Sequence, residues 1–389
     1  MKITKIELIP VSSPMAKPMV MPNTYITEIH SLVIKIHTDE GLVGIADSGD
    51  TSSWYRGELQ DTMIGMIRNV IAPQCLLGQD PLNIEKIVGL MDLLVRDNNQ
   101  AKALVDFALH DLKGKAFGVP VYQLLGGRTV EAQRQGWVVS AGPAEQQAAE
   151  AIEAIKNGYG LLKLKVGNGT IEDDVRSVAA VREAIGEHFP LTMDANGFWN
   201  YDRALLTMRR LDKFRMECIE QPLPWWDITG MARLRKQIDT PIFADESAQE
   251  LSHLRDLIDR EACDGLFLKL QKVGGLLKAQ RWLTMARLAN MRVMSGCMIG
   301  SSLEASPSVH LSVSDQWFSQ FMHENLGPVT IAGQWTTDGI DFEEIAQNTL
   351  LYKDGKTYPN EGPGLGIELN EEFLKRNQTK DRDIVTITA

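Results

Sequence analysis

The sequence has only four cysteines in 389 residues, and no two of them form a C-x-x-C pair. Few, scattered cysteines in a large chain are typical of a cytoplasmic protein with free thiols. Long apolar runs are missing too, since no stretch of about 18 apolar residues occurs. The N-terminal MKITKIELIPV alternates like a β-strand and lacks the apolar centre of a signal peptide. We therefore expect a cytoplasmic protein without a membrane span.

Positive charge is in deficit. The chain has 40 lysines and arginines against 51 aspartates and glutamates, which gives a net charge of −11. An acidic chain repels nucleic acid and acidic membrane surfaces, so we expect neither as a partner. The hydrophobic share of 44% supplies a large buried core. The length predicts one large domain and one smaller domain.

The first part of the chain predicts an α+β domain. Residues 2–11 and 30–38 alternate between apolar and polar, and Asp39-Glu40-Gly41 predicts a turn that joins 30–38 to 42–46. Helical periodicity follows over 83–95 and 101–117.

Short strand-like runs then alternate with helical segments. This alternation predicts a parallel sheet, and eight such units predict a (β/α) barrel of TIM type. The eight predicted strands are 135–140, 161–166, 191–195, 217–221, 241–245, 265–271, 292–297 and 319–324.

The tail has two strand-like runs, 350–352 and 356–358, and is expected to fold back onto the N-terminal region. An α+β capping domain would then be built from both chain ends. The predicted division is a cap over 1–128, a barrel over 129–332 and a returning segment over 333–389.

Three carboxylates end three consecutive predicted strands: Asp194, Glu220 and Asp245. Each step between them is one β-α unit, so they should meet at the C-terminal face, where barrel enzymes place their active sites. Three carboxylates at one point repel each other, and a hard divalent cation removes that conflict. Mg²⁺ prefers oxygen ligands, so the sequence predicts a Mg²⁺ site.

Lysines stand on both sides of this predicted site. Lys163 and Lys165 are two residues apart, so on a strand they point to the same side, and Lys269 lies in the strand after Asp245. This layout suits removal of the weakly acidic proton next to a carboxylate, while the metal stabilises the enolate charge. The base must be a neutral lysine, and we expect a second lysine and the metal to lower its pKa.

Each motif has a simpler interpretation when taken alone. A strand-end lysine pair is usually a solvated edge, Asp194-x-Asn196 can cap a helix, and Asp245-Glu246 can open one. Lys269 is harder to explain in this way, because an unpaired lysine in an apolar strand is costly. Together, the positions in register at strand ends favour the catalytic interpretation.

With these residues the chain resembles the enolase superfamily, and within it the muconate lactonizing enzyme subgroup. The matching motifs are Lys163-Leu-Lys165, Met193-Asp194-Ala-Asn196, Ile219-Glu220-Gln-Pro222, Ala244-Asp245-Glu246 and Leu268-Lys269-Leu-Gln-Lys-Val-Gly-Gly275. The resemblance implies that Asp194, Glu220 and Asp245 bind Mg²⁺. It also implies that Lys165 and Lys269 serve as base or acid on opposite faces, and that Lys163 supports the carboxylate and lowers the pKa of Lys165.

Substrate choice is expected to depend on two capping loops, 14–26 and 48–56, and on the end of the eighth strand. Dipeptide epimerases of the subgroup carry Asp-x-Asp there, whereas this chain has His323-Glu324-Asn325, and muconate lactonizing enzymes also have a Glu. The methionines and aromatic residues of the loops suit a partly apolar substrate. The predicted substrate contacts are Asn196, Glu246, Met298, Glu324, Tyr25 and Trp54.

The leading hypothesis is an isomerase: a racemase, epimerase or cycloisomerase of a small carboxylic acid that acts as a homo-oligomer. A dehydratase would use the same enolate and expel a β-hydroxyl, so the sequence leaves that alternative open. A barrel that only binds a ligand would lack one of the metal ligands or bases, and none is missing. A Schiff-base aldolase would use a lysine to form an imine.

Overall fold

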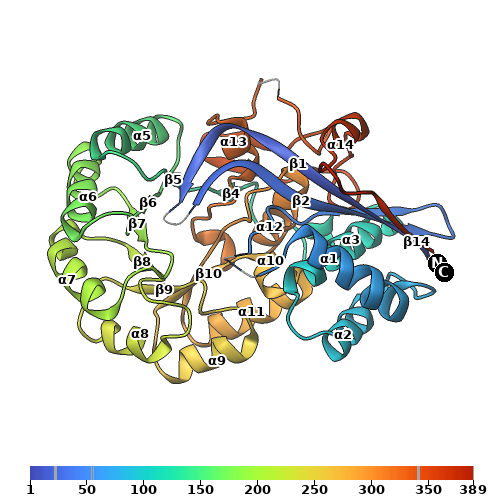
Figure 1. Ribbon diagram of the computed structural model, residues 1–389, viewed down its shortest axis with the longest axis horizontal. Coiled ribbons are helices and arrows are strands. Elements are labelled where there is room, and N and C mark those ends of the chain that lie inside the picture. The colour runs from blue at the N-terminus through green and yellow to red at the C-terminus, as the bar shows by residue number, and fades with distance from the viewer. Residues whose placement is uncertain (22–23, 54, 56, 340–341, 389) are drawn as a thin grey trace.

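The computed structural model describes residues 1–21, 24–53, 55, 57–339 and 342–388. It has two parts, which lie side by side in Figure 1. One part is a curved row of short parallel strands with helices on its outside. The other is a cap made from the beginning and the end of the chain, whose termini lie together far from the parallel strands.

The cap is built on a four-stranded antiparallel sheet. Alternating Ile and Val side chains of its long strands are buried against the helices. Gly41, in the turn predicted at 39–41, has φ 82°, a conformation that favours glycine. The predicted hairpin is therefore confirmed. In sheet order the strands are β14 (Val385–Thr388), β1 (Ile3–Met21), β2 (Thr24–Thr38) and β3 (Val43–Asp47).

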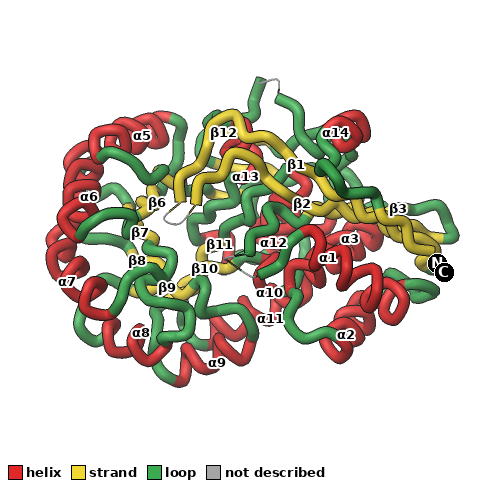
Figure 2. Tube along the Cα trace, viewed as in Figure 1, coloured by secondary structure: helices red, strands yellow, loops and turns green. Residues whose placement is uncertain are grey.

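The first predicted capping loop is wrong, because most of 14–26 belongs to β1 and β2. Pro14 and Pro18 are unusual in a strand, because proline cannot donate a hydrogen bond to a ladder. The fold tolerates them because β14 pairs only with residues 5–8, so this part of β1 has no β14 neighbour. The resulting long hairpin arches over the parallel strands in Figure 2.

Helices complete the cap and confirm both helical predictions. The helices α2 (Ile84–Leu94) and α3 (Asn99–Phe117) occupy the predicted ranges, and α3 is buried along most of its length. Before them, α1 (Gln60–Met66) continues into the π-helical segment Ile67–Leu76. After them, α4 (Val121–Leu124) leads into the second part.

A seven-stranded parallel sheet forms the second part, and its strands follow one another in chain order. Each strand lies within one of the first seven predicted ranges. The sixth ends earlier than predicted, because a short helix begins directly after Lys269. The strands are β5 (Trp137–Val139), β6 (Leu162–Lys165), β7 (Leu191–Asp194), β8 (Cys218–Glu220), β9 (Ile242–Ala244), β10 (Gly265–Leu268) and β11 (Arg292–Ser295).

Helices follow these strands and surround them in Figure 1. Several begin at side chains that accept backbone N–H groups, as Thr170, Asn200 and Ser301 do. The helices are α5 (Ala144–Lys156), α6 (Ile171–Ile185), α7 (Tyr201–Leu211), α8 (Ile228–Arg235), α9 (Leu251–Asp259), α10 (Leu270–Val273), α11 (Leu276–Leu288), α12 (Ser302–Ser314) and α13 (Gly327–Ala332).

The eighth predicted strand, 319–324, is wrong as an element. A 3-10 turn occupies Phe318–Gln320, and single parallel bridges follow, from His323 to Gln135 and from Glu324 to Gly296. Next to these bridges, a side chain takes the place of a backbone partner: the Asn325 backbone N–H donates to Gln135 Oε1 instead of to a neighbouring strand's carbonyl. The fold is thus mixed α/β, with a parallel sheet whose two edges are linked through this segment.

The chain end returns to the cap as predicted, since β14 pairs with β1. The strand pair predicted at 350–352 and 356–358 is confirmed as β12 (Leu351–Lys353) and β13 (Lys356–Tyr358). This pair adds to β4 (Gln133–Arg134) instead of the N-terminal sheet, so its expected location was wrong. The helix α14 (Glu371–Arg376) precedes β14.

A small apolar cluster packs inside the parallel sheet: Leu161, Cys218, Phe243, Phe267 and Met294. All four cysteines are free, as expected. In the part of the chain that the structure describes, no helix has the length and apolar character that a bilayer crossing requires.

Candidate active site

The three predicted metal ligands lie at the ends of three neighbouring strands. Asp194 is the last residue of β7, Glu220 is the last of β8, and Asp245 directly follows β9. Asp194 and Glu220 are partners in the parallel register. All three are buried, with at most 3% of each exposed, so their charges need partners within the protein.

Lys163 on β6 joins several of the predicted residues. Its Nζ lies 2.7 Å from Glu220 Oε2, 2.5 Å from Glu324 Oε2 and 3.8 Å from Asp194 Oδ2. The ammonium group also lies 3.7 Å from the ring centroid of Phe267, in cation–π contact. Lys163 therefore sits at the centre of the carboxylates.

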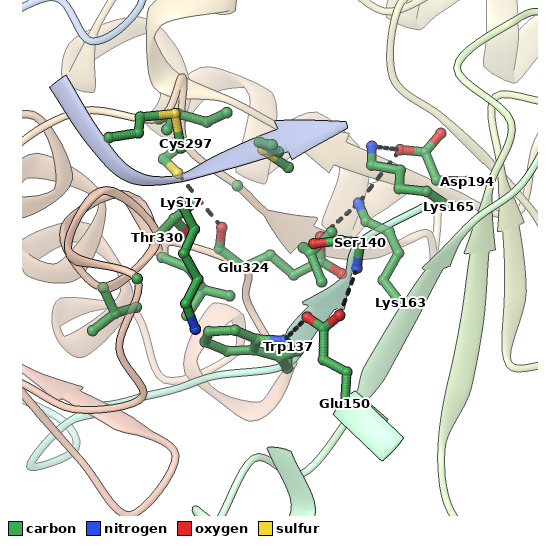
Figure 3. Close-up of a pocket in the computed structure, with 18 of the residues that line it drawn as sticks. Lys17, Trp137, Ser140, Glu150, Lys163, Lys165, Asp194, Cys297, Glu324 and Thr330 are labelled. Atoms are coloured by element: carbon green, nitrogen blue, oxygen red, sulfur yellow. Dashed lines mark hydrogen bonds and ion pairs between the residues drawn. The ribbon is translucent and has the colours of Figure 1, made fainter. Parts of the chain in front are cut away.

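Lys165 lies at the end of the same strand and contacts the same oxygen of Asp194 more closely. Its Nζ is 2.6 Å from Asp194 Oδ2 and donates to Asn196 Oδ1 at 3.0 Å. Asn196 in turn donates from its backbone to Asp194 and from Nδ2 to Glu246 Oε1. Figure 3 shows Lys165 and Asp194 facing each other beside Lys163.

Asp245 is held by a third group of side chains. The Nζ of Lys269 lies 3.1 Å from Asp245 Oδ2, and that of Lys272 lies 2.6 Å from Oδ1. Lys272 also donates to the carbonyls of Asp245 and Phe267, which satisfies its ammonium group. The Tyr55 hydroxyl donates to Asp245 Oδ1 at 2.6 Å. Asp245 is thus fixed in position, and Lys269 keeps room to donate elsewhere.

Burial and neighbouring charges shift the carboxyl pKa values in different directions. Burial raises the pKa of Glu220 well above its usual value, and the charges of Asp194 and Asp245 raise it further. Burial acts in the same direction on Asp194 and Asp245, but the adjacent lysines outweigh it and lower both pKa values. Burial and the Asp245 charge raise the pKa of Glu246 to about 7. The cluster therefore carries more carboxylate than its lysines neutralise.

The surrounding carboxylates raise the pKa values of two lysines. Burial lowers the pKa of Lys163, but the charges of Glu220, Glu324 and Asp194 outweigh it and raise this pKa well above normal. Burial is likewise outweighed at Lys269, chiefly by Asp245, so its pKa is also raised. The lowering expected for the base depends on a bound metal as well as a second lysine, so it stays a prediction beside these carboxylate effects.

The donor set suits a hard divalent cation. The carboxylates supply the oxygen ligands that Mg²⁺ prefers, and Glu246 Oε2 is buried without a hydrogen-bond partner. Among the described residues, no three acidic, histidine or cysteine side chains form a ready-made cage. Lysine ammonium groups lie instead against the carboxylate oxygens of Asp194, Glu220 and Asp245. Burial raises the pKa of Glu220 and the charges of Asp194 and Asp245 raise it further, and a bound cation would relieve that repulsion.

A cavity of about 390 Å³ opens above the lysines. Its lining includes Lys17 and Met19 of the β1–β2 hairpin, together with Trp137 and Trp335. The residues at its inner end are Lys163, Lys165, Asp194, Glu220, Lys269 and Glu324. Both predicted catalytic lysines therefore reach the same enclosed space.

The predicted substrate contacts are placed differently from one another. Glu324 lines the cavity, whereas Asn196 and Glu246 lie behind the carboxylates and bond to each other. Met298 is buried where its carbonyl accepts from the Asp50 backbone, and Tyr25 is 62% exposed. Neither lines the cavity. Trp54 lies outside the described residues.

Sequence reasoning missed several residues of the site. Tyr55 falls in the predicted loop 48–56 and Lys272 in the motif after Lys269, but neither was connected to Asp245. A lysine in a short apolar helix was the signal for Lys272, because such a charge needs a buried partner. Glu150 of α5 also lines the cavity, and nothing in its local sequence marked it. Lys17 lines the cavity too and falls in segment 14–26, which was predicted to influence substrate choice, although Lys17 itself was not named.

Comparison with known families covers most of the chain. Residues 3–126 match the "Mandelate racemase / muconate lactonizing enzyme, N-terminal domain" family. Residues 146–373 match the "Enolase C-terminal domain-like" family.

Individual relatives agree with these matches. The chain is 34% identical to an N-succinyl-L-Arg/Lys racemase of Bacillus cereus, over 99% of this chain and 100% of the relative. A solved mandelate racemase/muconate lactonizing family protein from Azoarcus sp. EbN1 superimposes with a TM-score of 0.95 at 54% identity, over all of both chains. A dipeptide epimerase from Cytophaga hutchinsonii, complexed with Mg and the dipeptide D-Ala-L-Val, gives a TM-score of 0.89 at 26% identity, also over all of both chains.

Proposed function

The chain belongs to the enolase superfamily, in its muconate lactonizing enzyme subgroup, and is an isomerase; we propose that it racemises or epimerises a small carboxylic acid. Its first step is removal of the proton next to the carboxylate, which gives an enolate. The observation that carries this proposal is that Lys165 and Lys269 reach one cavity from different strands, with β7, β8 and β9 between them.

Two lysines on opposite faces of the substrate account for inversion. Lys165 takes the proton from one face and Lys269 delivers a proton to the other, and the roles exchange for the opposite enantiomer. Lys163 does not exchange protons in this scheme, because its ammonium group pairs with Glu220 and Glu324. It holds these carboxylates in place beside Lys165.

Asp194, Glu220 and Asp245 are the proposed ligands of Mg²⁺. Bound there, Mg²⁺ would neutralise the charge that now raises the lysine pKa values, and would stabilise the negative charge of the enolate. Tyr55 and Lys272 fix the orientation of Asp245. The Mg complex of the Cytophaga hutchinsonii relative supports this choice of metal.

The substrate sits in the cavity with its carboxylate toward the lysines and the rest of it toward the hairpin. Glu324 lines the cavity and contacts the substrate directly, whereas Asn196, Glu246, Met298 and Tyr25 are outside the cavity lining and are no longer proposed as contacts. Trp54 stays a predicted contact. Cycloisomerisation uses the same first step and is the second outcome. The relatives named above are a racemase and an epimerase, so they lend no support to a dehydratase.

The architectural part of the proposal is a closed (β/α) barrel of TIM type, with the segment around His323 and Glu324 in place of the eighth strand. Its parallel bridges to Gln135 and Gly296 support closure. The domains are 1–128, 129–332 and 333–389, and the family match over 3–126 supports the first boundary.

A cytoplasmic homo-oligomer is also proposed. The four free cysteines support the compartment. Light scattering of the purified protein would test the assembly.

The experiment that tests the function is a screen of carboxylic acids in D₂O with Mg²⁺, followed by NMR of the α-proton. Exchange of the α-proton in both enantiomers of one compound, with no loss of water from it, is the expected result. A new double bond in the product would support the dehydratase instead. If no carboxylate exchanged its α-proton, the proposal would be contradicted.

A further inference from the structure

Glu150 is a carboxylate in the cavity wall that the proposed reaction does not use. It projects from α5, and its two oxygens are held separately: Oε1 accepts from Trp137 Nε1 at 2.8 Å, and Oε2 accepts from the Ser140 backbone N–H at 3.3 Å. All three residues line the cavity. Figure 3 shows Glu150 and Trp137 meeting at the side of the cavity away from Asp194.

The charge of Glu150 lacks a close counter-ion. Its hydrogen bonds come from neutral donors, and no described lysine or arginine forms an ion pair with it. Burial raises the pKa of Glu150, and the hydrogen bonds from Trp137 and Ser140, followed by the charge of Lys17, offset this only in part. A half-buried carboxylate that is oriented but not neutralised attracts a cation from the cavity.

Aromatic rings stand next to this carboxylate. The ring centroids of Trp137 and Trp335 are 4.1 Å apart, and both residues line the cavity. Tyr159 packs against Trp137 at 5.0 Å, and its hydroxyl donates to the Trp335 carbonyl, which fixes the pair. Indole faces attract cations and bind apolar chains well. A carboxylate and two indoles together suit a cationic group on an aliphatic chain.

We propose that Glu150, Trp137 and Trp335 form a subsite for a positively charged group at the far end of the substrate. The substrate is then a carboxylic acid whose side chain ends in an ammonium or guanidinium group. This inference rests on the proposed function in one respect: it assumes that the reacting carboxylate of the substrate lies beside the catalytic lysines.

Lys17 marks the rival arrangement, in which the far end of the substrate is an anion. The Lys17 side chain is exposed on the hairpin. Its aliphatic part lies close to Gly333: a Cβ atom built on Gly333 would be 3.3 Å from Lys17 Cγ. Glu150 is held by two hydrogen bonds, whereas Lys17 has no ion pair among the described residues. Glu150 is therefore the more preorganised of the two charged groups. Because Glu150 is an anion, this favours a substrate with a cationic end.

The test uses three N-acetyl amino acids that differ at the end of the side chain: N-acetyl-L-lysine, N-acetyl-L-norleucine and N-acetyl-L-2-aminoadipate. Calorimetry of the Mg²⁺-loaded enzyme should show the lysine derivative binding about tenfold tighter than the norleucine derivative. Glu150→Gln should remove that difference. Glu153→Gln, on the exposed side of the same helix, should preserve it, and Lys17→Met should preserve or increase it.

Three results would overturn the subsite. The first is equal binding of the lysine and norleucine derivatives, and the second is a preference for the lysine derivative that remains in Glu150→Gln. The third is that the aminoadipate derivative binds most tightly and that Lys17→Met abolishes this preference. Absence of binding by all three compounds would overturn it as well. Deuterium exchange, followed in the same samples, tests the reaction separately: selective binding without any exchange would contradict the proposed function and leave the subsite standing.

Discussion

Lys165 and Asp194 are direct register partners on β6 and β7, and their side chains meet with 2.6 Å between Nζ and Oδ2. A proposed base and a proposed metal ligand are therefore aligned by the sheet itself. Since a shift of one residue in register turns every side chain to the other face, the strand pairing fixes the catalytic geometry. The same pairing places Asp194 beside Glu220.

Removal of the metal should abolish α-proton exchange, and Mg²⁺ should restore it. The carboxylate charge that raises the pKa of Glu220 and keeps Lys163 and Lys269 protonated would then be uncompensated. NMR exchange rates before and after EDTA treatment measure the effect. Glu220→Gln should not respond to Mg²⁺, whereas Glu153→Gln, at a side chain of α5 that is 47% exposed, should behave like wild type. Full exchange in EDTA would contradict the metal assignment.

Tyr55→Phe should weaken Mg²⁺ binding by roughly 10- to 100-fold, which is the usual effect of losing a group that orients a metal ligand. The hydroxyl donates to Asp245 Oδ1, and the ring contributes no ligand of its own. Titration of activity against free Mg²⁺ gives the midpoint. Tyr201→Phe, at the start of α7, is the matched control. An unchanged midpoint in Tyr55→Phe would show that Lys272 and Lys269 orient Asp245 without the hydroxyl.

Lys272→Met should destabilise the protein by about 3 kcal/mol, because the buried charge of Asp245 loses its shortest ion pair. Urea unfolding measures the free energy. A second change, Asp245→Asn, removes the orphaned charge and should recover part of the loss. Lys156→Met, at an exposed ion pair, should change stability by less than about 1 kcal/mol. A similarly small effect for Lys272→Met would contradict this account.

Glu344 should make the protein less stable as the pH rises. Burial raises its pKa from 4.5 to about 8, although bonds from Ser302 oppose the shift. Between these two values the unfolded chain ionises Glu344 while the folded protein keeps it protonated. The free energy of unfolding therefore falls with rising pH, by up to about 1.4 kcal/mol per pH unit for this group, and levels off above about 8.

Glu344→Gln imitates the protonated form and should remove this dependence. The variant should match wild type near pH 5 and exceed it at pH 9, as measured by urea unfolding. Glu343→Gln is the control, because that side chain is 62% exposed. A stability difference between Glu344→Gln and wild type that does not change with pH would show that Glu344 does not titrate in this range.

The sequence predicts most of what the backbone imposes on the site. The alternation of strands and helices locates seven parallel strands, and the residues at their ends include both lysines and all three carboxylates. These signals are local, because the end of a strand can be recognised from the pattern of only a few neighbouring residues. The eighth strand failed for a local reason too: around His323 and Asn325, side chains and single bridges replace a regular ladder.

Contacts between distant segments could not be predicted from patterns. Tyr55 reaches Asp245 across 190 residues, and Lys17 reaches the cavity because β1 and β2 continue past two prolines. The carboxylates that raise the pKa values of Lys163 and Lys269 were also left out of the sequence-based expectation. Those carboxylates come from several strands, and their combined charge is visible only once the strands are assembled.

The most direct test of the two-lysine mechanism is deuterium exchange of each enantiomer of an exchanging carboxylate by Lys165→Ala and Lys269→Ala. Wild type should exchange the α-proton of both enantiomers. Each variant should exchange one enantiomer roughly 10²- to 10⁴-fold more slowly than wild type, and the affected enantiomer should differ between the two variants. The control Lys156→Ala should exchange both enantiomers at the wild-type rate. Wild-type exchange of both enantiomers by either lysine variant would contradict the account.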